Sequence, residues 1–196
     1  GCWWKSNYYE GSAGIPFIVR WPGVVSPGSM SAAVCNLMDV GPTLAEIAET
    51  RFPYPVAGTS MCRILAAGHD NEWPNETTSE LVDRRGGVFA SRMVRSGPWK
   101  LWAFADAAGL PPTLFKLDED PEEVHDLARN PDCQKTREHL LARLHQDWDP
   151  ASAAGKSRRY EAYFHVLEQW GQTVRPDSPM ALIYPPPEYE NDVELL

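Results

Sequence analysis

The chain has 196 residues, the length of one domain or of one domain with appendages. With 43% hydrophobic and 23% charged residues it has the composition of a globular protein, which excludes a wholly disordered chain. The formal net charge of -9, without a cluster of Lys and Arg, argues against nucleic acid as a partner, and no apolar run approaches the ~18 residues of a membrane helix.

The first predicted element is a strand over residues 15–21. This run is mostly apolar and β-branched, and Pro22 and Gly23 close it. Such runs are typical of strands buried on both faces of a mainly parallel sheet. A helix start at Asp39 and the spacing of the apolar residues that follow then predict an amphipathic helix over residues 40–48, packed against this strand.

The pattern changes after a polar loop at residues 69–74. Short apolar runs at residues 88–94, 99–104 and 114–117, separated by Gly- and Pro-containing turns, predict an antiparallel meander. A helix over residues 131–148 should cover the meander, because its large apolar side chains fall on one stripe.

The C-terminal part is predicted to be a helix followed by a tail. Aromatic residues at helical spacing indicate a helix around residues 160–167, and the proline-rich stretch after it cannot continue a helix. We therefore divide the chain into residues 1–74, the end of a larger domain, residues 75–150, a sheet and helix subdomain, and residues 151–196. The last part is suited to covering a second subunit, so we expect that a homo-oligomer would form through it.

Four sequence blocks occur in a specific order within residues 1–148. They are Lys5-Ser6-Asn7-Tyr8-Tyr9-Glu10-Gly11 with the strand that follows, Asp39-Val40-Gly41-Pro42-Thr43-Leu44, Met93-Val94-Arg95-Ser96-Gly97-Pro98-Trp99-Lys100-Leu101, and Leu114-Phe115-Lys116-Leu117-Asp118-Glu119-Asp120-Pro121-Glu122-Glu123 closing on Asp126-Leu127-Ala128. Together they resemble the formylglycine-dependent sulfatases, and the Trp3-Trp4-Lys5 start is most similar to the choline-sulfatase and phosphonate-monoester-hydrolase branch. The resemblance implies an α/β fold, in which the end of an alkaline-phosphatase-like mainly parallel sheet domain is followed by a small α+β subdomain with an antiparallel sheet.

Lys5 is the catalytic residue that the resemblance implies. In sulfatases this lysine binds the sulfate group, where an ammonium offsets charge on the transferring oxygens. The alternative is a surface lysine beside an aromatic cluster. Tyr9, Glu10 and Gly11 are interpreted as holding the loop in shape, because a carboxylate next to a sulfate would repel it.

The resemblance also implies groups that this sequence does not carry. The nucleophile of the family arises from Cys or Ser in a Cys/Ser-x-Pro-x-Arg motif, and no cysteine here begins such a motif. Ser96-Gly97-Pro98-Trp99-Lys100 ends in lysine instead, and we interpret it as a β-turn. A divalent metal, calcium or manganese, is expected with ligands upstream of this chain, whose start inside an aromatic stretch predicts preceding sequence.

Neither the acidic nor the histidine residues predict a metal site of their own. The acidic residues after residue 117 lack the spacing of an EF-hand, so a solvated acidic turn is expected there. His125, His139 and His145 are interpreted as surface residues, because His139 and His145 would face different sides of one helix.

The sequence therefore predicts the C-terminal portion of a sulfuric ester hydrolase that acts on a small-molecule sulfate ester and is inactive on its own. We expect a soluble protein, and the sequence does not distinguish a cytoplasmic from a periplasmic location. One alternative is a phosphodiesterase or phosphonate monoester hydrolase of the same superfamily, which shares the lysine. Another is a non-catalytic oligomerisation module.

Overall fold

The computed structural model describes residues 6–83, 89–105 and 110–174. The chain divides into two compact units, Gly1–Ala154 and Gly155–Leu196, and the three-part division predicted from the sequence stays a prediction. In chain order the elements are α1 (Glu10–Ala13), η1 (Leu37–Asp39), α2 (Val40–Ile47), α3 (Cys62–Ala67), β1 (Glu76–Asp83), β2 (Phe89–Ser96), β3 (Trp99–Phe104), β4 (Thr113–Lys116), η2 (Pro131–Cys133), α4 (Gln134–His145) and α5 (Pro150–Val174). None of these helices, within the described ranges, is long and apolar enough to cross a membrane.

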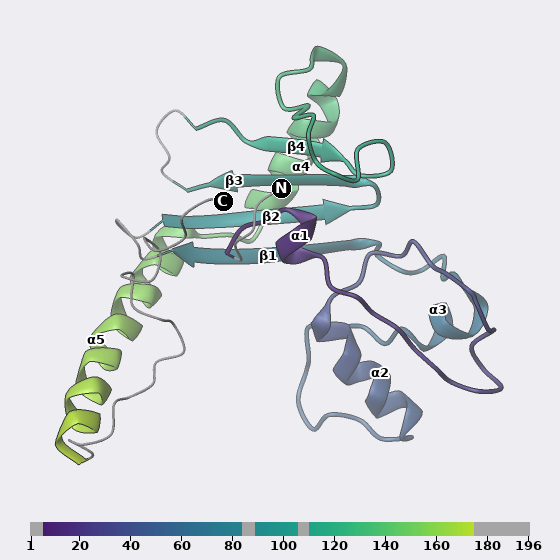
Figure 1. The fold of residues 1–196 in the computed structure, drawn as a ribbon, viewed down its shortest axis with the longest axis horizontal. Coiled ribbons are helices and arrows are strands. Elements are labelled where there is room, and N and C mark those ends of the chain that lie inside the picture. The colour runs from purple at the N-terminus through teal and green to yellow at the C-terminus, as the bar shows by residue number, and fades with distance from the viewer. Residues whose placement is uncertain (1–5, 84–88, 106–109, 175–196) are drawn as a thin grey trace, which may run out of the picture. The chain divides into compact units, whose positions relative to one another are not determined.

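The centre of the first unit is a four-stranded antiparallel sheet in the order β1-β2-β3-β4 (Figure 1). Ser96 pairs with Trp99, so Gly97 and Pro98 form the tight turn between β2 and β3. Gly97 adopts φ 52°, a left-handed conformation that glycine reaches without steric cost. The predicted antiparallel meander is confirmed, and its first strand, β1, is an addition that the sequence pattern did not indicate.

Both faces of the sheet are covered. Helix α4 lies against one face and the segment around α1 against the other (Figure 1). The α4 side buries Ala90, Val94, Leu101, Leu114, Ala128, Leu140, Leu144 and Trp148. The other side buries Tyr8, Met93, Trp102, Phe115 and Leu117. The predicted helix and its apolar stripe are therefore confirmed, although the α-helix covers only Gln134–His145 and Trp148 packs from beyond its end.

The predicted strand over residues 15–21 is wrong, because this segment has no regular structure and is largely exposed. Ile18 is 91% exposed and Phe17 45%. An extended chain becomes a strand only when its N–H and C=O groups pair with a neighbour, and the described sheet, which is wholly antiparallel, pairs with none of these residues. Helix α2 does form as predicted over Val40–Ile47, but without the strand against which it was expected to pack.

The helix predicted around residues 160–167 is also confirmed. Helix α5 runs from Pro150 to Val174, and its large apolar side chains are exposed, with Tyr160 at 65% and Trp170 at 63%. The proline-rich tail predicted after it lies outside the described residues.

Candidate functional site

Lys5 lies outside the described residues, so the site is built from the segment that follows it. Three residues on, Tyr8 is buried against the sheet at 5% exposure. Its hydroxyl donates a hydrogen bond to the Ser91 backbone oxygen at 2.7 Å and lies 3.1 Å from the Ser91 Oγ. Its ring packs at 6.1 Å from that of Trp102, and the Tyr9 ring meets Trp102 edge-on at 5.1 Å. Strands β2 and β3 thereby fix the chain just after Lys5.

Burial raises the pKa of Tyr8 to about 12, outweighing its hydrogen bond to Ser91, which acts in the opposite direction. Between about pH 10 and pH 12 the unfolded chain therefore loses this proton while the folded chain keeps it, so stability falls as pH rises.

We expect the free energy of unfolding of the wild-type chain to fall more steeply with pH than that of the Tyr8→Phe variant. From pH 9 to pH 11 the difference between the two free energies of unfolding should shrink by roughly 1 kcal/mol. Urea unfolding of the chain at several pH values measures this, and parallel pH profiles would contradict the assignment.

A buried ion network lies beside Tyr8. Lys100 is buried, and its Nζ lies 2.7 Å from Oε1 of Glu10 and 2.7 Å from Oε1 of Glu123. The second oxygen of Glu123, Oε2, accepts the backbone N–H of Glu10 at 2.5 Å. Arg95 adds a further cation, with Nη1 3.5 Å from Oε1 of Glu10. Two carboxylates thus face two cations, and the cluster is balanced in charge.

The alternation of strand β3 explains why Lys100 points inward. Leu101 belongs to the cluster under α4, while Trp102 belongs to the cluster under the N-terminal segment. Lys100 is two residues from Trp102, so its side chain leaves the sheet on the same face. Trp99 and Leu101 occupy the opposite face, in the cluster that α4 covers. Sequence reasoning missed Lys100. The signal that could have revealed it is its position two residues before Trp102 in the same strand, which places both side chains on one face.

The turn after β4 places Glu123. The expected solvated acidic turn is confirmed for Asp118, Glu119 and Glu122, which are exposed, and is wrong for Asp120 and Glu123. Asp120 and Glu123 are only 9% and 7% exposed. The Asp120 carboxylate accepts the backbone N–H groups of Val124 and His125. Burial acts to raise the pKa of Asp120, but these donors outweigh it and the pKa is lowered. Asp120 and Glu123 are buried because Asp120 holds the turn in shape and Glu123 pairs with Lys100.

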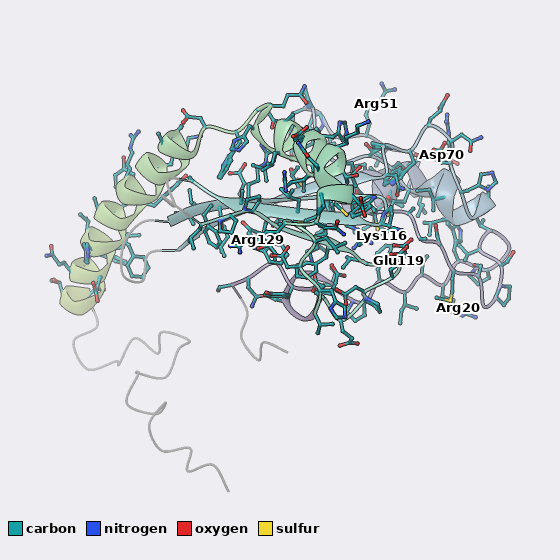
Figure 2. All side chains as sticks on the ribbon, turned by 90° about the horizontal axis from the view of Figure 1, so that it is seen from above. Arg20, Arg51, Asp70, Lys116, Glu119 and Arg129 are labelled. Carbon is teal, nitrogen blue, oxygen red and sulfur yellow. The ribbon has the colours of Figure 1, made fainter. Side chains whose placement is uncertain are left out.

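Lys116, on the neighbouring strand β4, forms an ion pair at the surface. It pairs with Glu119, whose side chain is 68% exposed, and both are labelled in Figure 2. Surface pairs of this kind contribute little to stability, whereas a buried charge must be paired to be tolerated. Of these two lysines, only the buried Lys100 therefore requires its carboxylate partners for the fold to be stable.

The described part of the chain does not offer a coordination site for the divalent metal that the sulfatase resemblance implies. No group of three or more His, Cys, Asp or Glu side chains there could hold a metal ion. The carboxylates of Glu10 and Glu123 both accept hydrogen bonds from Lys100. The metal thus stays an expectation about sequence beyond this chain. What these residues can do chemically is to hold a segment in place.

Several known proteins are similar in sequence to part of this chain. The family model described as "N-sulphoglucosamine sulphohydrolase, C-terminal" matches residues 1–149. Arylsulfatase K of Xenopus laevis is 32% identical over 132 residues, covering 64% of this chain and 24% of that protein. The ulvan-active sulfatase of Formosa agariphila is 30% identical over 158 residues, covering 65% of this chain and 31% of that protein. The chain thus spans between a quarter and a third of the length of these relatives.

A solved structure shares the fold. The structure of BT4656 in complex with its substrate D-glucosamine-2-N,6-O-disulfate matches with a TM-score of 0.65 at 21% identity, covering 74% of this chain and 31% of that one. This likeness confirms the predicted α/β class with its small antiparallel subdomain.

Proposed function

Because the chain belongs to the family of N-sulphoglucosamine sulphohydrolase C-terminal domains, we propose that it is the C-terminal part of a sulfatase in which Lys5 binds the sulfate group of a small-molecule ester. The observation that carries the proposal is the anchoring of the segment after Lys5. Tyr8 and Glu10 attach this segment to the sheet by a buried hydroxyl and a buried ion network. A lysine next to such an anchor is suited to act as a fixed charge donor.

The proposed role of Lys5 is electrostatic. Its ammonium offsets negative charge on the sulfate oxygens and on the leaving oxygen as the S–O bond breaks, without itself forming a bond. The nucleophile, a formylglycine in this family, and the divalent metal are expected in sequence beyond this chain. The exposed apolar side chains of residues 15–30, with Ile18 and Met30 at 91% and 95% exposure, support further protein covering that surface.

The chain of 196 residues alone is expected to show no enzyme-dependent hydrolysis of aryl sulfates or phosphodiesters, whether calcium or manganese is added. The reason is that charge stabilisation without an attacking group leaves only a small residual effect. Steady-state assays of the purified chain against a buffer blank test this. Turnover that scales with chain concentration would contradict the proposal that the nucleophile lies elsewhere.

A phosphodiesterase or phosphonate monoester hydrolase is the alternative within the superfamily, since the same lysine would bind a phosphoryl oxygen.

A role in oligomerisation is favoured by a separate observation. Helix α5 exposes apolar side chains at helical spacing, namely Tyr160, Tyr163, Phe164, Leu167 and Trp170. We propose that a second copy of the chain covers this stripe. Sedimentation of the chain as a monomer at micromolar concentration would count against it.

A further inference from the structure

The segment after Lys5 is attached to the first unit through Glu10. The side chain of Glu10 accepts from Lys100 at 2.7 Å, and its backbone N–H donates to Glu123 at 2.5 Å. We propose that Lys100 and Glu123 are positioning residues: through Glu10 they hold the loop that carries Lys5 in the geometry needed for sulfate transfer. This inference rests on the proposed function of Lys5 and adds two residues, from β3 and from the turn after β4, that act through it.

The side chains of Lys100, Glu123 and Glu10 are buried to different extents. The side chains of Lys100 and Glu123 are 1% and 2% exposed, while that of Glu10 is 40% exposed. Lys100 and Glu123 therefore form a neutral pair inside the first unit. Glu10 is the outer member, and it is the one that belongs to the segment after Lys5.

Glu123 serves both partners at once. Its Oε1 accepts from Lys100, and its Oε2 accepts the backbone N–H of Glu10. Glu123 itself adopts φ 55°, an uncommon conformation for a non-glycine residue, within the turn that Asp120 holds. Both oxygens thus have fixed directions, and the backbone of the loop is held as well as its side chain.

Gly14 leaves room for the Glu10 carboxylate. A Cβ at this position would lie 2.8 Å from the backbone oxygen of Glu10 and 2.8 Å from its Oε2. Any larger residue must displace both atoms or shift its own backbone. The conformation in which Glu10 reaches Lys100 therefore depends on the glycine.

Chain connectivity links this anchor to Lys5. Lys5 precedes Tyr8 by three residues, so only Ser6 and Asn7 stand between them in the sequence. Ser91 holds Tyr8, and Lys100 holds Glu10. Both contacts therefore lie within five residues of Lys5 in the sequence. A misplacement of about 1 Å at a reacting group can cost up to a hundredfold in rate, so loosening this anchor should be visible in turnover.

The test is a double-mutant cycle in the full-length enzyme. Glu10→Gln keeps the size of the side chain and leaves the buried pair of Lys100 and Glu123 intact, so folding is preserved. With Lys5 present, Glu10→Gln should lower kcat by about ten- to a hundredfold. In a Lys5→Ala background the same change should lower kcat less than about twofold, because the residue being positioned is gone. Glu72→Gln, which removes an exposed partner of Arg63, is the matched control and should leave kcat unchanged in both backgrounds.

A second variant keeps every charge. Gly14→Ala should displace the Glu10 carboxylate and show the same dependence on Lys5. Amide hydrogen exchange of residues 8–14 in the 196-residue chain should be faster in both variants than in wild type, at unchanged urea midpoints.

The outcomes separate the inference from the function on which it rests. If Lys5→Ala lowers turnover but Glu10→Gln costs the same factor in both backgrounds, the positioning role is overturned and the function of Lys5 stands. If Lys5→Ala leaves turnover unchanged, the proposed function fails and the positioning role falls with it.

Discussion

Lys5→Ala in the full-length enzyme is expected to lower the turnover of a sulfate ester by about a hundredfold to a thousandfold. The physical reason is that one preorganised charge donor at a transferring oxyanion contributes ~2.7 to 4 kcal/mol to the transition state. Folding should be nearly unchanged, because a lysine ordinarily contributes little to a hydrophobic core. Steady-state kinetics with urea unfolding of the same preparation measures both quantities.

Lys5→Arg is the informative companion variant. A planar guanidinium keeps the positive charge but cannot place it where a compact ammonium stood, so only part of the activity should return. A folded Lys5→Ala protein with near-normal turnover would contradict the sulfate-binding role. The interpretation of Lys5 as a surface residue would then hold.

Lys100→Met is expected to destabilise the chain by about 3 to 5 kcal/mol. Methionine fills a similar volume, but it leaves the Glu123 carboxylate buried without its cation. That carboxylate is 2% exposed, and only the Glu10 backbone N–H and the turn geometry remain to hold it. The free energy of unfolding from urea titration of the chain measures the loss.

Two further variants make this result specific to the buried network. Lys116→Met removes the lysine whose partner Glu119 is exposed, and it should change stability by less than about 1 kcal/mol. Lys100→Met combined with Glu123→Gln should recover part of the loss, because no unpaired buried charge remains. Equal effects of Lys100→Met and Lys116→Met would show that the network does not constrain the fold.

The sheet and its covering helix could be predicted because their residues carry local signals. Strand β3 alternates between the two faces, Gly97 marks the turn before it, and α4 has its leucines on one stripe. Strand β1 lacked such a signal. Its sequence is largely polar, and it forms because β2 offers it a full register of partners from Glu76 to Asp83. Pairing of this kind is a property of the neighbour rather than of the strand.

Residues 15–21 show the opposite case. The run has the composition of a buried strand, yet Ile18 is 91% exposed and unpaired in the described structure. Composition indicates what a segment tolerates, and a strand still requires neighbouring strands to supply hydrogen bonds.

The sequence indicated the loop of the candidate site, but it did not indicate Lys100 and Glu123, the residues that hold this loop. Glu10 was assigned a structural role on electrostatic grounds, and the structure pairs it with Lys100. Lys100 and Glu123 escaped prediction because lysine and glutamate are ordinarily exposed, and their burial depends on contacts between residues 113 positions apart in the case of Glu10 and Glu123. The role of Lys5 itself stays a prediction.

The most direct measurement of the central claim is the hydrolysis of an aryl sulfate by the full-length protein, compared with the matched phosphonate ester under the same conditions. The account predicts a higher kcat/KM for 4-nitrophenyl sulfate than for 4-nitrophenyl phenylphosphonate, and the loss of sulfate turnover in Lys5→Ala. Faster hydrolysis of the phosphonate, or sulfate turnover no higher than that of the Lys5→Ala variant, would contradict it.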